Sequence, residues 1–295
     1  MPCMSSSSPS RQPLRGILLM LGGIACLAAS DAASKLLAAT VPTAQIMWIR
    51  FVVFAPLAVL IALRAVGRAG LRSRQPLLQV IRGIGLLGSG FGFIAGMQFL
   101  PLAQATAVFF VAPLLVILLS VPLLGEVARA RQWTAVCLGL LGVLIIVRPG
   151  SAGFHPALIF PVISAASWAF AFVMARKMRA DSPLLTLAYT AVVGLIVCTA
   201  LLPFSYVPLG WREIGLGLMT ALFFAAAQLL LILAVRFAQA NELAPFAYSQ
   251  LIWAALFGLL IFGNLPDVWT LVGAVVIVAS GLAATSRPKR ATISA

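Results

Sequence analysis

The sequence is a series of long apolar segments separated by short polar gaps, a pattern that leaves few possible folds. A helix needs about 20 apolar residues to cross the hydrocarbon of a bilayer, and these segments have about that length. Prolines stand at the start of several segments, as they do in the first turn of helices. We therefore predict ten spans, at about 15–38, 43–63, 76–99, 102–124, 131–147, 156–176, 183–202, 212–235, 243–262 and 266–285.

The composition excludes a soluble globular fold. Hydrophobic residues make up 62% of the chain and charged residues only 9%, whereas a soluble domain has about 25% charged residues. The net charge of +14 does not indicate a nucleic-acid partner, because the basic residues occupy short gaps and form no continuous basic face. The chain is expected to be an all-α integral membrane protein surrounded by lipid.

The basic residues also predict the orientation. Fifteen of the twenty fall in gaps on one side of the predicted topology, two fall on the other side, and Lys35, Arg50 and Arg82 lie within spans. Lysine and arginine are enriched in cytoplasmic loops. Both termini are therefore predicted to be cytoplasmic, with residues 1–14 and 286–295 as tails of a multi-pass protein in the bacterial inner membrane.

Part of the sequence is repeated later in the chain with low similarity. The segment 99–150 has a copy at 237–282 that preserves the order of its polar and tryptophan landmarks. Five spans per half would give the two halves opposite orientations, an inverted repeat common among secondary transporters. We predict repeats at 15–148 and 156–285. The matched landmarks are Ala103-Gln104-Ala105 with Ala238-Gln239-Ala240, Gly125-Glu126 with Gly263-Asn264, and Trp133-Thr134 with Trp269-Thr270.

Five short motifs give the chain a family resemblance. It resembles the EamA branch of the drug/metabolite transporter superfamily, which implies a ten-helix carrier without a cofactor. The stretches Ser30–Lys35 and Ile81–Gly83 resemble the subgroup of S-adenosylmethionine and riboflavin carriers. Asn264 departs from the family's pattern, where a glutamate often follows the glycine. The motifs are Arg50-Phe51, Ala112-Pro113, Gly125-Glu126, Gly139 with Gly142, and Ser167-Trp168-Ala169.

Charged residues within or beside the spans are the first candidate site. A charge at the bilayer centre costs at least about 2.5–3.5 kcal/mol, so each should be paired or face a wet cavity. Asp31 and Arg50 lie at matched depth, and Lys35 is one helical turn from Asp31, close enough to pair with it. Arg82 has a possible partner in Glu126. Both groups allow a structural ion pair as well as a role in substrate binding or gating.

The second half offers aromatic and amide groups instead of deep charges. Such groups suit the wall of a site for an organic metabolite, although hydrogen bonding between helices would explain the polar ones equally well. The candidates are Trp168, Gln228, Tyr248, Gln250 and Trp253.

An enzyme, a metal site and a cofactor are not expected. The GxGxxG pattern at 83–88 lies inside a span with no preceding strand, and His155 is the single histidine. The sequence favours a secondary transporter that moves a small organic metabolite by alternating access. The first expectation is an exporter of an amino acid, metallophore or related compound. An uptake carrier for S-adenosylmethionine or riboflavin, and a passive channel or scaffold, are the alternatives. Proton or exchange coupling and oligomeric state stay open.

Overall fold

The computed structural model describes residues 13–127, 129–148, 155–178, 181–238 and 240–285. These residues form helices and contain no strand. Nine helical stretches among them are long and apolar enough to cross a membrane, and Val268–Ala283 is apolar but shorter. The predicted tails lie almost wholly outside the described residues, as does Gln239 of the second predicted copy. The all-helical membrane fold is therefore confirmed.

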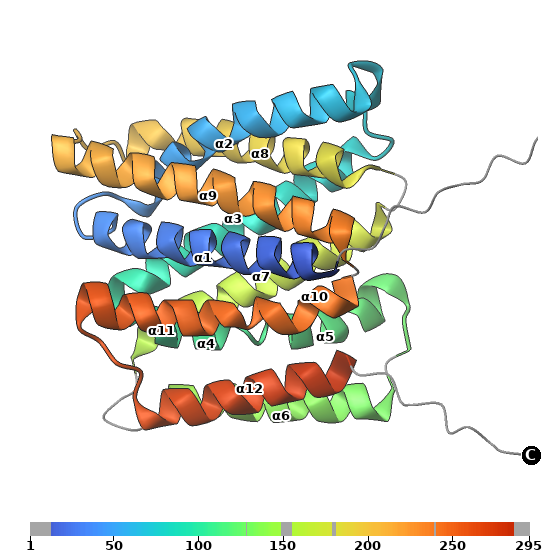
Figure 1. Ribbon diagram of the computed structural model, residues 1–295, viewed down its shortest axis with the longest axis vertical. Helices are drawn as coiled ribbons and strands as arrows, with labels where there is room; N and C mark the ends of the chain where they lie inside the picture. Colours follow the sequence, from blue (N-terminus) through green and yellow to red (C-terminus); the bar gives the residue numbers. More distant parts are fainter. Residues whose placement is uncertain (1–12, 128, 149–154, 179–180, 239, 286–295) are drawn as a thin grey trace, which may run out of the picture.

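The helices lie side by side with their long axes roughly parallel, and α1 starts at the same end of the bundle at which α12 ends (Figure 1). Short 3-10 turns, η1 (Ala69–Leu71), η2 (Pro156–Leu158) and η3 (Leu202–Phe204), connect some of them. The helices are α1 (Pro13–Leu37), α2 (Thr43–Val66), α3 (Pro76–Phe99), α4 (Leu102–Phe109), α5 (Ala112–Leu124), α6 (Ala130–Val147), α7 (Ile159–Lys177), α8 (Pro183–Leu201), α9 (Trp211–Phe237), α10 (Ala240–Ala247), α11 (Ser249–Phe262) and α12 (Val268–Thr285).

Two predicted spans are interrupted. The span 102–124 consists of α4 and α5, and the span 243–262 falls on α10 and α11. At the first interruption the N–H of Val111 bonds to the carbonyl of Val108, a tighter turn than an α-helix makes. Pro113 has no N–H to continue the α-helical ladder there, and Pro245 stands three residues before the second interruption. The apolar pattern alone did not reveal either break.

Helices distant in sequence pack closely. α1 lies against α9, α3 against α7, α2 against α8, and α6 against α12. Small residues permit the closest approaches. A Cβ atom added to Gly142 of α6 would lie 2.7 Å from Cγ1 of Ile277 and 2.9 Å from the carbonyl oxygen of Gly273, both on α12. The α6–α12 contact therefore depends on glycine.

Gly142→Ala should lower stability by about 1–3 kcal/mol, because the added methyl overlaps α12 and forces the two helices apart. Thermal unfolding in detergent measures the change. Gly215→Ala in α9 is the matched control, since a Cβ there meets no atom within 4 Å. Equal stabilities for the two variants would contradict the assigned contact.

Candidate functional site

Arg50 is a hydrogen-bonding centre between α1, α2 and α9. Its Nη2 donates to Oδ1 of Asp31 at 3.0 Å, to Oγ of Ser34 at 2.8 Å and to the carbonyl of Ser30 at 3.1 Å. Its Nε donates to Oγ1 of Thr220 on α9 at 3.1 Å. Asp31 and Arg50 are 5% and 4% exposed. The pairing expected from their matched depth is present, while its role in transport stays a prediction.

Hydroxyl groups complete this buried cluster. Ser30 Oγ donates to the Thr220 carbonyl at 2.8 Å, and Thr220 Oγ1 donates to the Ser30 carbonyl at 2.9 Å. The Cζ atom of Arg50 also lies 5.2 Å from the ring centre of Phe224, a favourable cation–π position. Sequence analysis missed Thr220 and Phe224, because a lone threonine or phenylalanine in an apolar span gives no signal of its own.

Lys35 does not pair with Asp31, which corrects the sequence-based expectation. Its Nζ donates to the carbonyl of Met97 at 2.7 Å and to that of Leu100. Nζ also lies 5.3 Å from the ring centre of Phe262. The last carbonyls of a helix lack partners in their own helix and attract cations, so the end of α3 binds the ammonium while Arg50 holds Asp31.

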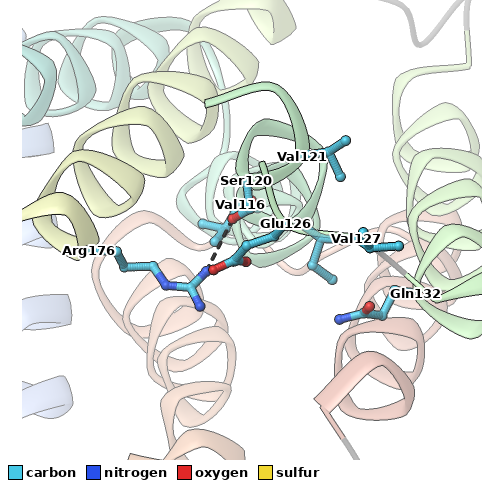
Figure 2. A pocket seen from close by; sticks show the side chains of 8 residues that line it. Val116, Ser120, Val121, Glu126, Val127, Gln132 and Arg176 are labelled. Carbon is cyan, nitrogen blue, oxygen red and sulfur yellow. Dashed lines mark hydrogen bonds and ion pairs between the residues drawn. The ribbon is translucent and has the colours of Figure 1, made fainter. Parts of the chain in front are cut away.

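Arg82 and Glu126 do not pair either. Arg82 Nη1 donates to Oγ1 of Thr190 on α8, and its buried Nε has no partner within the described part of the chain. Glu126 instead accepts from Nη1 of Arg176 at 3.2 Å. The two predicted partners contact different helices, because Arg82 lies against α8 whereas Glu126 follows α5 and meets the end of α7 (Figure 2).

Two cavities lie at opposite ends of the bundle. The first, about 120 Å³, adjoins the Glu126–Arg176 pair, and Arg176 also donates to Oγ of Ser120 at 3.2 Å (Figure 2). The second, about 300 Å³, is lined by Lys35, Arg212 and other residues near the ends of α1, α3 and α11. Sequence analysis missed Arg176 and Arg212, since both looked like ordinary loop-flanking arginines.

The aromatic candidates lie near the interruptions. Tyr248, between α10 and α11, has its ring centre 5.1 Å from that of Phe110, between α4 and α5. Trp168 of α7 stacks on Phe172 at 5.2 Å and meets Phe109 edge-on at 6.3 Å. The two helix breaks therefore face each other through an aromatic contact.

The remaining predicted residues lie on α9 and α11. Trp253 stacks on Phe257 with ring centres 6.0 Å apart. Gln228 and Gln250 are partly buried, and neither side chain hydrogen-bonds to another described residue.

Asp181, just before α8, binds the loop between α2 and α3. Its carboxylate accepts from Ser73 Oγ at 2.5 Å, Gln79 Nε2 at 2.8 Å and the Arg74 N–H at 3.2 Å. Partial desolvation would raise the pKa of Asp181, but the hydrogen bonds from Ser73, Gln79 and Arg74 outweigh it and hold that pKa below its usual value. The ionised form is thus the one that ties the loop to α8.

Asp31→Asn should destabilise the protein by about 3–5 kcal/mol, because it leaves the Arg50 guanidinium buried without its counter-charge. Glu126→Gln is the control, since its pair has side chains 35% and 41% exposed and should cost about 1 kcal/mol or less. Unfolding in detergent compares them. A loss for Asp31→Asn no larger than for Glu126→Gln would contradict the central importance of the buried pair.

Asp181→Asn should lower the melting temperature at pH 7 and progressively less in acid. A carboxyl group whose folded-state pKa is lowered stabilises the protein above its unfolded pKa, and that stability is lost as pH falls through the folded-state pKa. The difference between wild type and variant should therefore shrink below about pH 4, the ordinary aspartate value. A difference that stays constant from pH 7 to pH 3 would exclude the ionised carboxylate as its cause.

These features define a class. A bundle of long apolar helices, with an ion pair buried among them and two helices broken partway, is a multi-pass membrane protein built around polar groups in its interior. The profile of the EamA-like transporter family matches residues 14–148 and 155–285, and the chain belongs to this drug/metabolite transporter family. This family is one of transporters.

Similar proteins cover almost the whole chain. An S-adenosylmethionine uptake transporter of Rickettsia prowazekii is 25% identical over 91% of this chain and 92% of its own. A pseudopaline exporter of Pseudomonas aeruginosa is 29% identical over 93% of this chain and 97% of its own. One solved crystal structure resembles this protein with a TM-score of 0.63 and 20% sequence identity. The match covers 93% of this chain and 98% of the chain in that structure, and it supports the fold alone.

Proposed function

We propose that this protein is a secondary transporter of the bacterial inner membrane that moves a small organic metabolite by alternating access. The observation that carries the proposal is the meeting of the two interrupted spans at Phe110 and Tyr248, 5.1 Å apart. Discontinuous helices at the interface of two repeats are typical of transporter binding sites, because their breaks expose polar backbone groups and permit bending.

Matching hydrogen bonds support an inverted repeat of residues 15–148 and 156–285. Ser30 of α1 donates to the Thr220 carbonyl of α9 at 2.8 Å, with the two hydroxyl oxygens 3.1 Å apart. Ser164 of α7 donates to the Ser89 carbonyl of α3 at 2.7 Å, with hydroxyl oxygens 3.2 Å apart. The first and eighth spans thus contact each other as the sixth and third do.

The interrupted spans also end alike. α5 ends at Gly125 with φ 66° and α11 ends at Gly263 with φ 66°. After each glycine the next N–H bonds to a carbonyl six residues back, from Glu126 to Ser120 at 3.4 Å and from Asn264 to Gly258 at 2.9 Å. The left-handed conformation required here favours glycine. Gly125 and Gly263, which correspond in the two sequence copies, therefore both end a helix in this conformation.

Polar contacts join the halves at both ends of the bundle. At one end Asp181 binds Ser73 and Gln79. At the other end Gln45, on the first turn of α2, exchanges two 2.9 Å hydrogen bonds with the backbone of Val207. Breaking one set while keeping the other would open the bundle on one side at a time. With both termini cytoplasmic, the Asp181 contacts would face the cytoplasm.

In this mechanism Arg50 of α2 would hold α1, α2 and α9 as one moving unit, because its guanidinium bonds to both α1 and α9. The half-helices would bend at Phe110 and Tyr248. We propose that Trp168, Gln228, Tyr248, Gln250 and Trp253 line the central path, and that Lys35, Arg82 and Glu126 act nearer its ends.

Direction and substrate need a direct assay, because the similar proteins include both an uptake transporter and an exporter. Purified protein in proteoliposomes would be tested for flux of S-adenosylmethionine, riboflavin and amino acids in both orientations. A carrier should show counterflow, in which unlabelled solute inside accelerates entry of labelled solute.

For at least one of these solutes we expect saturable counterflow that empty liposomes lack. Flux that neither saturates nor shows counterflow would support a passive channel. No flux for any solute across a wider metabolite panel would favour a scaffold.

A further inference from the structure

The 300 Å³ cavity at the end of the bundle opposite the termini has a distinct charge character. Lys35 and Arg212 line it together with Thr40 and Gln98, and no acidic side chain is among its lining residues. Glu213 follows Arg212 in sequence, but its carboxylate oxygen lies 2.7 Å from the position of a Cβ on Gly210. The cavity therefore combines two cations with neutral polar groups.

Both cations retain hydrogen-bonding capacity. Lys35 Nζ uses two of its three N–H groups on the carbonyls of Met97 and Leu100. Arg212, in the first turn of α9, has no hydrogen bond or ion pair with another described residue. A guanidinium has five N–H donors whose planar fork fits an oxyanion. The N-terminal turn of α9 adds a favourable potential for negative charge.

We propose that this cavity is a binding subsite for the carboxylate or phosphate group of a small water-soluble metabolite. Arg212 would bind the oxyanion through its fork, and Lys35 would add the third N–H of its ammonium. The apolar part of the solute would lie against Phe262, whose ring also borders the cavity. A volume of about 300 Å³ is at the lower end of small-molecule sites, which suits one end of a solute better than a whole large one.

The subsite rests on the proposed function, since it would bind the substrate as it enters or leaves the path at this end. It narrows the substrate class to compounds with at least one carboxylate or phosphate group. Its test needs no knowledge of the true substrate, so it can fail separately from transport.

The experiment measures melting of the full-length protein in a neutral detergent while inorganic phosphate or citrate replaces chloride at constant ionic strength. Wild type should be stabilised with rising probe concentration, because a ligand that binds only the folded state raises its stability. Arg212→Gln should raise the half-saturating concentration about tenfold, the loss expected for one charge-assisted hydrogen-bonding group.

Arg68→Gln is the matched control, because Arg68 is an exposed arginine at the opposite end of the bundle. Lys35 joins α1 to the end of α3, so Lys35→Gln is expected to disturb the fold, and Arg212→Gln is the variant used for the test. Stabilisation that is absent in wild type, or equal in all three proteins, overturns the subsite.

A second arm separates a soluble oxyanion from a lipid headgroup. The measurements are repeated in nanodiscs of phosphatidylcholine alone and with phosphatidylglycerol added. In phosphatidylcholine alone, we expect phosphate or citrate to raise the melting temperature of wild type more than that of Arg212→Gln. If phosphatidylglycerol alone produces that difference and the soluble probes add nothing, the cavity is a headgroup site and the proposal is wrong. Positive binding without counterflow would instead reject the alternating-access carrier and keep the subsite.

Discussion

The interior of this protein depends on one requirement: a charged side chain within the hydrocarbon of the bilayer must have a partner, because lipid cannot solvate it. In hydrocarbon an isolated carboxylate or guanidinium is strongly unfavourable, so Asp31 and Arg50 are stable only with each other and with the hydroxyls around them. Satisfying one guanidinium requires α1, α2 and α9 to meet at fixed positions. The pair thus sets helix arrangement as much as it neutralises charge.

Backbone N–H and C=O groups at the helix interruptions also need hydrogen-bond partners, because lipid supplies none. The interruptions after α4 and α10 would expose carbonyls to lipid if they lay on the surface. Instead they meet inside the bundle, where Phe110 and Tyr248 contact each other. At the first break Val108, Phe110 and Val111 are buried, so this tighter turn packs against side chains and not against lipid. In the proposed mechanism these two breaks would also be the places where the half-helices bend.

Sequence reasoning identified the residues better than their partners. Arg50 with Asp31 was foreseen because matched depth on adjacent spans restricts the choice. Lys35 and Arg82 were assigned the wrong partners, because an α3 carbonyl and the Thr190 hydroxyl leave no trace in a pattern of charges. Helix ends came close to prediction where proline begins a helix, as at Pro76 and Pro183, and failed at the interruptions inside apolar runs.

The sequence by itself determined that the chain lies in a membrane and which charged groups must be compensated. These follow from local hydropathy and from the cost of unsolvated charge, which need no knowledge of distant contacts. Only the tertiary structure decided that Arg50 hydrogen-bonds to Thr220 and that Arg176 pairs with Glu126. It also decided that Lys35 and Arg212 line one cavity. Those contacts join residues on separate helices, and their geometry depends on how the helices pack.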